Sequence, residues 1–149
     1  MHIPTEIVEG CSNTIRQIVF TGGANVTEMS VGINAFFQND AANTLVSVVF
    51  PEGLTSLDIF EQAFYQYASN EDNTLRDIVF PSSLKSLNIR AGAFSQGRRV
   101  YSTGDNALAS VTFPEGLETL AIGDHAFYQI GACFRVRITP CVRSTSRRR

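Results

Sequence analysis

LVSVVFPEGLTSLDIFEQAFYQ, the segment at residues 45–66, recurs along the chain with most of its letters kept. Residues 75–96 read LRDIVFPSSLKSLNIRAGAFSQ, and residues 108–129 read LASVTFPEGLETLAIGDHAFYQ. A looser copy at residues 15–38, IRQIVFTGGANVTEMSVGINAFFQ, is two residues longer at its turn. Successive copies start 30, 30 and 33 residues apart, a period typical of solenoid repeats. The repetition therefore predicts a stack of similar coils, each burying its apolar residues against its neighbours.

Each copy contains two short segments in which large apolar residues occupy every second position. In the copy at residues 45–66 these segments are residues 47–50, SVVF, and residues 56–59, SLDI. A period of two predicts strands with one buried face and one outward face. Pro51-Glu52-Gly53 lies between the two segments, and a proline followed closely by a glycine favours a β-turn.

An Ala-Phe pair follows the second strand segment of every copy. We expect a helical or 3-10 turn there, with the phenylalanine closing the interior of the coil. The phenylalanines of this row are Phe36, Phe64, Phe94 and Phe127, and a second row is formed by Phe20, Phe50, Phe80 and Phe113. The predicted fold is a β-rich α/β solenoid of about four coils, each with two short strands and a short helical turn.

The repeats divide the chain into three regions. Residues 1–12 form an N-terminal lead-in, residues 13–130 contain the four repeats at 15–38, 45–66, 75–96 and 108–129, and residues 131–149 diverge. In the divergent region Phe134, Val136 and Ile138 occupy alternate positions, which predicts one final strand before an arginine-rich tail. Solenoids need polar caps, and neither end supplies a clear one, so we expect a fragment of a longer protein or an altered C-terminus.

Basic residues are concentrated at the C-terminus. Residues 135–149 hold six of the 12 Lys and Arg residues and none of the 14 acidic ones. The remainder is strongly acidic and does not favour nucleic-acid binding, which needs clustered Lys and Arg. The arginine tail could be a solvated chain end, or it could contact an anion or RNA without specificity.

Two amide positions also recur in every copy. A glutamine follows each Ala-Phe phenylalanine by two residues, at Gln38, Gln66, Gln96 and Gln129. An asparagine precedes each opening Leu or Ile by two residues, at Asn13, Asn43, Asn73 and Asn106. Amide side chains both donate and accept, so we interpret these residues as partners for backbone groups at the bends of the coil. A polar stripe for a ligand is the alternative.

The three closest copies resemble the leucine-rich repeats of the BspA type, also called the Treponema pallidum type. The resemblance rests on Leu45–Phe64, Leu75–Phe94 and Leu108–Phe127, with Ile15–Phe36 matching less closely. The chain departs from the family in having glutamine after the Ala-Phe pair, where Cys or Asn is frequent, and phenylalanine before the proline. The resemblance implies a curved or gently twisted solenoid in a surface or secreted protein of bacteria or protists, one that binds host matrix, cells or proteins. It implies no catalytic residues, because the family shares none.

Residues that could support catalysis are few. A Cys–His pair of Cys133 with His125 is conceivable but lacks a third orienting group, and His2 is the only other histidine. Nucleotide-binding, serine hydrolase and zinc protease motifs are absent, so we expect no enzyme activity, cofactor or metal site. The cysteines form no metal motif; either Cys11, Cys133 and Cys141 are free thiols, or one disulfide joins the last two.

Two surfaces are candidates for partner binding. The first strands turn a β-branched row outward, which either marks a contact site or reflects β-propensity alone. This row consists of Val19, Val49, Val79 and Thr112. The second surface is the loop edge after each recurring glutamine, where Arg98, Arg99 and Tyr101 follow one repeat after Tyr65 and Tyr67. Arg and Tyr are frequent in binding hot spots.

The sequence thus favours a non-catalytic module that recognises a protein or host surface. Self-association through open solenoid ends is the alternative function. No signal peptide or membrane span is evident in the sequence, so a surface or secreted location follows from the resemblance only.

Overall fold

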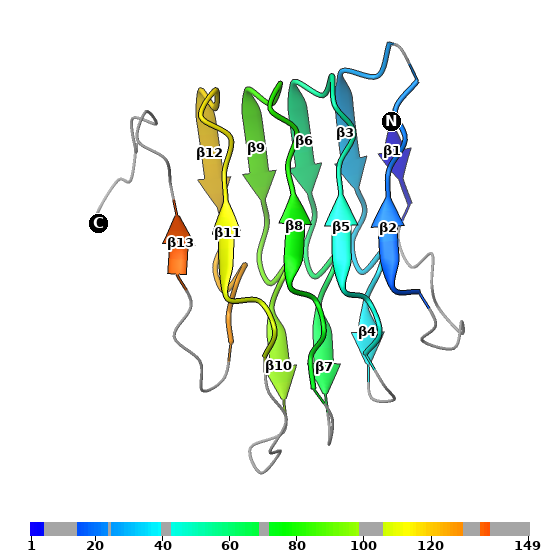
Figure 1. The fold of residues 1–149 in the computed structure, drawn as a ribbon, viewed down its shortest axis with the longest axis vertical. Helices are drawn as coiled ribbons and strands as arrows, with labels where there is room; N and C mark the ends of the chain where they lie inside the picture. The colour runs from blue at the N-terminus through cyan, green and yellow to red at the C-terminus, as the bar shows by residue number, and fades with distance from the viewer. Residues whose placement is uncertain are drawn as a thin grey trace.

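The chain winds into a parallel β-solenoid of about three turns, seen in a computed structural model (Figure 1). The structure describes residues 1–4, 15–23, 25–39, 43–68, 72–98, 106–129 and 135–137. Within them, every strand pairs with the equivalent strand of a neighbouring coil, and all pairings are parallel. The predicted solenoid of stacked coils is confirmed.

Three sheets and one further pair of strands run along the described part of the solenoid. Sheet A has the order β1 (His2–Ile3), β3 (Glu28–Val31), β6 (Ser56–Ile59), β9 (Ser86–Ile89) and β12 (Thr119–Ile122). Sheet B contains β2 (Gln17–Val19), β5 (Ser47–Val49) and β8 (Asp77–Val79), and beside β8 lies the pair β11 (Ser110–Thr112) and β13 (Arg135–Arg137). Sheet C contains β4 (Gln38–Asn39), β7 (Gln66–Ala68) and β10 (Gln96–Arg98). Each coil therefore visits sheets B, A and C in turn.

The strand segments alternate as the period of two predicts. In β6 the inward residues Leu57 and Ile59 are buried, whereas the outward Ser56 and Asp58 are only partly covered. Leu57 lies opposite Met29 and Leu87 of the neighbouring coils, so each inner row continues through the stack.

The phenylalanines form two aromatic stacks along the interior. In the Ala-Phe row, Phe36, Phe64, Phe94 and Phe127 stack with successive ring centroids 5.2, 5.1 and 5.5 Å apart. In the other row, Phe20, Phe50, Phe80 and Phe113 stack at 5.3, 5.6 and 5.7 Å. The two rows meet edge to face, as Phe50 does with Phe64. Offset and edge-to-face contacts of this kind add stability beyond the area that the rings bury.

The recurring amides form two hydrogen-bonded ladders. Gln66 donates from Nε2 to Gln38 Oε1 at 2.8 Å and to the Leu45 carbonyl, and its Oε1 accepts from the Leu75 amide. Gln96 and Gln129 repeat the donations to the preceding glutamine and to the opening leucine carbonyl. The asparagine ladder runs the opposite way, with Asn43 donating to Asn73 Oδ1 at 2.7 Å and Asn73 donating to Asn106 Oδ1 at 2.8 Å. These side chains give buried backbone groups at the bends the partners that they need. Asn13 lies outside the described residues.

The predicted helical turn at the Ala-Phe pair is wrong. No residue that the structure describes is helical, and the pair instead lies in a turn that contains a left-handed residue. In the four successive copies this residue is Asn34, Gln62, Gly92 and His125, and its φ is 54°, 56°, 65° and 57° respectively. A left-handed residue ends any helical run, and the amide of the following phenylalanine donates to the next coil, as Phe64 does to the Ala93 carbonyl at 2.8 Å.

The strand count per coil and the number of coils also differ from the prediction. Each complete coil has three strands, because the chain becomes extended again at the recurring glutamine and pairs as sheet C. The four copies of the repeat produce about three turns, since the steps from β2 to β5, β8 and β11 each complete one. The described part of the chain holds no helix of the length and hydrophobicity that a membrane crossing requires.

Candidate functional site

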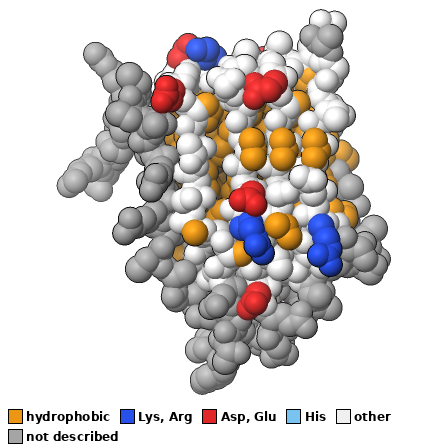
Figure 2. All heavy atoms as spheres, viewed as in Figure 1, with side chains coloured by type: hydrophobic (Ala, Val, Ile, Leu, Met, Phe, Trp, Pro, Cys, Tyr) orange, Lys and Arg blue, Asp and Glu red, His pale blue; other side chains and the backbone are white. Residues whose placement is uncertain are grey.

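The outer face of sheet B carries a row of exposed aliphatic side chains. Val19, Val49 and Val79 lie opposite one another in the parallel register of β2, β5 and β8. Val19 and Val79 are 53% and 49% exposed, and Val49 between them is partly covered by its neighbours. Figure 2 shows a row of hydrophobic side chains crossing this face. We call these three residues the valine stripe.

Polar groups surround the valine stripe on the same face. The adjacent outward row of the three strands is Gln17, Ser47 and Asp77, and Thr112 occupies the position equivalent to the valines on β11. Arg16 and Arg76 immediately precede β2 and β8 and are exposed. In Figure 2 basic and acidic groups lie close to the hydrophobic row. The face thus combines an apolar centre with a charged and polar rim, the usual layout of a protein-binding patch.

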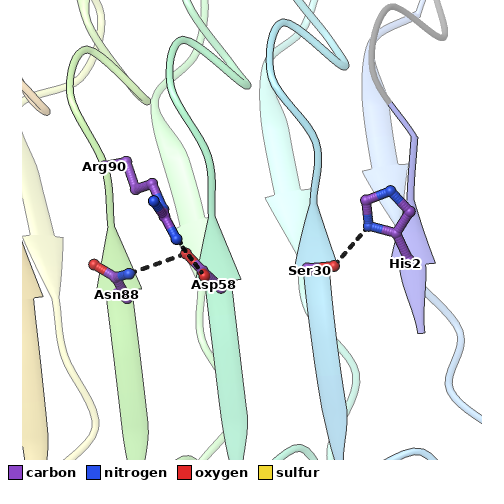
Figure 3. Close-up of polar contacts among 5 residues, drawn as sticks. All are labelled: His2, Ser30, Asp58, Asn88 and Arg90. Atoms are coloured by element: carbon purple, nitrogen blue, oxygen red, sulfur yellow. Dashed lines mark hydrogen bonds and ion pairs between the residues drawn. The ribbon is translucent and has the colours of Figure 1, made fainter.

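The outer face of sheet A is different, because its charges are already paired. Asp58 accepts from Arg90 Nη2 at 3.0 Å, from Arg90 Nε at 3.2 Å and from Asn88 Nδ2 at 3.1 Å (Figure 3). The hydrogen bond to Asp58 raises the pKa of Arg90 above its ordinary value. The Arg90 guanidinium also lies 4.1 Å from the centre of the Phe60 ring. These contacts tie neighbouring coils together.

One further pair on sheet A has reactive side chains. His2 Nδ1 lies 2.7 Å from Ser30 Oγ, on the rim of a shallow hollow that Met1, Glu28 and Asp58 also line (Figure 3). A serine hydrolase triad needs a carboxylate on the other imidazole nitrogen. Asp58 is instead on the strand at the far side of Ser30 and bonds to Arg90 and Asn88. Ser30 therefore has a histidine neighbour, but the carboxylate does not orient that histidine.

Sequence reasoning missed the His2–Ser30 pair. His2 belongs to the lead-in before the repeats and enters sheet A through a strand of two residues, β1. Two residues carry no periodicity, so no pattern in the sequence could have predicted this pairing.

The predicted loop edge is only partly described. Tyr67 lies opposite Gly97 in sheet C, and Arg98 belongs to β10, while Arg99 and Tyr101 lie outside the described residues. Tyr65 stacks on Phe37 with ring centroids 5.2 Å apart, and Tyr67 lies beside it at 6.5 Å. Gly97 leaves room for this packing, because a Cβ at that residue would collide with the Tyr65 hydroxyl.

Burial, and to a smaller extent the neighbouring Tyr67, raises the pKa of Tyr65 above its ordinary value. The two tyrosines are thus partly covered against sheet C, and their rings lie along the coil edge where they pack on one another.

The other residues considered for chemistry are not assembled into a site. His125 is exposed in a turn and meets the Tyr128 ring edge to face at 5.2 Å. Its conceivable partner Cys133 lies outside the described residues, as do Cys11 and Cys141. Where the structure describes the chain, no three His, Cys, Asp or Glu side chains come together as a metal site would require.

No protein-family model, curated protein or solved structure matches this chain. The chemistry of its surfaces is therefore the basis on which a function can be proposed.

Proposed function

We propose that this chain is a non-catalytic recognition module of the leucine-rich repeat kind that binds a protein through the outer face of sheet B. The valine stripe carries the proposal. Outward positions have no core to fill, yet this row repeats valine on three successive strands and leaves two of them about half exposed. Aligned apolar side chains that remain in water mark contact surfaces more often than scattered ones do.

The shape of the face indicates the class of partner. The stripe crosses three paired strands, which are spaced roughly 4.8 Å apart, and its side chains are short. Small-molecule sites are concave and enclose most of their ligand. A flat face with an apolar centre, and with Arg16, Arg76 and Asp77 at its rim, instead suits another protein surface.

The resemblance of the repeats to the BspA type supports a location and a kind of partner. Proteins with such repeats are found at cell surfaces and bind host matrix, cells or other proteins. We propose the same setting for this chain, with an extracellular-matrix protein as the partner class to test first.

The decisive experiment replaces the valine stripe without disturbing the strands. Val19→Thr, Val49→Thr and Val79→Thr together replace three exposed methyl groups with hydroxyls while keeping β-branching. Thr112 already occupies the equivalent position on β11. Binding to a panel of purified matrix glycoproteins would be measured by surface plasmon resonance. We expect the triple variant to bind at least about tenfold more weakly, a loss of about 1.4 kcal/mol.

A matched control carries Ser56→Thr and Ser86→Thr on the outer face of sheet A, where Thr119 is the natural equivalent. The control should bind as the unaltered protein does. Equal binding by the stripe variant, or failure of the unaltered protein to bind any matrix protein, would contradict the proposal.

A further inference from the structure

The last strand of sheet A has an open edge. β12 pairs with β9 on one side, and among the described residues no strand pairs with its other side. Ile122 on this strand is 43% exposed, whereas Ile59 and Ile89 at the equivalent positions are fully buried. An apolar strand edge of this kind is a template for pairing with another chain.

The two ends of the solenoid have complementary steps. At the C-terminal end, the strand pair beside sheet B reaches one strand beyond β11, to β13, while sheet A stops at β12. At the N-terminal end, sheet A reaches one strand beyond β3, to β1, while sheet B begins at β2. Figure 1 shows β13 and β1 at opposite ends of the stack. Because each coil visits sheet B before sheet A, the strand position that follows β13 is the one that β1 of a second copy would fill.

We propose that the protein associates head to tail, with β1 of one copy pairing in parallel with β12 of the next. The registers within each copy define the pairing. His2 lies opposite Ser30, and that row continues through Asp58 and Asn88 to Ala121. Ile3 lies in the row that ends at Ile122. In the assembly His2 therefore faces Ala121, and Ile3 covers the exposed Ile122. The same translation places β2 of the second copy beside β13.

Pro4 makes this joint weaker than a junction between coils. Within the solenoid, the residue after each sheet A strand donates its amide to the preceding coil, as Phe60 does to Val31 and Arg90 to Ile59. Pro4 follows β1 at that position and has no amide hydrogen, so the Ile122 carbonyl receives no donor there. Proline is a common protection for exposed strand edges, and here it keeps the association reversible.

The association would be measured by sedimentation velocity over a range of concentrations of the full chain. A head-to-tail contact does not close on itself, so we expect a concentration-dependent series of dimers and longer oligomers. Ile122→Lys should raise the dissociation constant at least about tenfold because it places a charge in the apolar contact. The control is Val79→Lys, since Val79 is 49% exposed on the outer face of sheet B and belongs to neither β1 nor β12.

Pro4→Ala should act in the opposite direction. It restores the missing donor and should lower the dissociation constant, by roughly the fivefold to tenfold that one added hydrogen bond gives. A single closed dimer, a monomer at all concentrations, or no response to Pro4→Ala would overturn the proposal.

Cross-linking tests which ends meet. In a background without the native cysteines, a His2→Cys protein mixed with an Ala121→Cys protein should be joined by a short bis-maleimide. Neither protein alone should form the cross-linked dimer, and a homotypic product would contradict the head-to-tail geometry. The valine stripe lies on another face, so its threonine variant should associate normally. Failure of recognition and failure of assembly are therefore separate outcomes.

Discussion

The second and fourth copies of the repeat have nearly the same residues but different environments. Leu57 and Ile59 in the second copy are 1% and 0% exposed. Leu120 and Ile122 occupy the same positions in the fourth copy, where the leucine is only partly buried and the isoleucine is 43% exposed. Burial in a solenoid thus depends on the coils on both sides, and not on the residue type alone. The comparison between central and terminal coils predicts how strongly each position should respond to mutation.

The largest effect is expected from the aromatic stack. Phe64 is fully buried between Phe36 and Phe94, whereas Phe127 ends the stack at 9% exposure. Phe64→Ala should lower the free energy of unfolding by about 3–5 kcal/mol, because it leaves a cavity in the middle of the stack. Phe127→Ala should cost less. Urea denaturation followed by circular dichroism checks both, and equal losses would show that the coils do not differ in this way.

The glutamine ladder should give the next largest difference. Gln66 is fully buried, and its Oε1 accepts from the Thr74 and Leu75 amides. Gln66→Met keeps the volume but leaves these amides without that acceptor, which should cost about 2–3 kcal/mol. Gln129 is less buried, and Gln129→Met should cost less because water can reach the groups that lose their partner. The free energies of unfolding from urea titrations would test the order.

The ion pair on sheet A should matter less than either internal feature. Arg90 and Asp58 have side chains that are 38% and 32% exposed, so solvent screens their attraction. Arg90→Met, which keeps the stem over Phe60, should lower the free energy of unfolding only slightly. This loss should shrink as salt is added, because dissolved ions screen the attraction between the two exposed side chains in the unaltered protein. A loss that does not depend on salt would indicate packing and not charge.

The repeat period predicted the stacked coils, and the alternation within β6 predicted which of its side chains face inward. The nature of the Ala-Phe turn was not predictable in the same way. Asn34, Gly92 and His125 are residue types that adopt a left-handed backbone more readily than most, but Gln62 is not, so the position has no single side-chain signature. Asn34, Gln62 and Gly92 each donate the backbone amide to the next coil, and a backbone hydrogen bond of this kind is not visible in side-chain patterns.

The sequence likewise predicts one of the two candidate surfaces but not the other. The outward direction of the valine stripe follows from strand alternation, so the sequence could place it before the structure was known. The sequence predicted open solenoid ends in general, but not that β12 is the open edge of sheet A or that β1 matches it. These two features depend on where each sheet ends, and β1 is too short to have a recognisable pattern.

The smallest effect is expected at the left-handed turn position. Gln62 adopts a φ of 56°, which costs a residue with a Cβ more than it costs glycine. Gln62→Gly should therefore stabilise its coil by a few tenths of a kcal/mol up to about 1 kcal/mol, after the entropy lost by glycine on folding is subtracted. Gly92→Ala is the reverse experiment in the next coil, where the new Cβ would lie 3.3 Å from Gln62 Cγ, and it should destabilise. Opposite signs in thermal unfolding would show that the backbone conformation is what the repeat maintains here, while equal signs would assign the position to side-chain contacts.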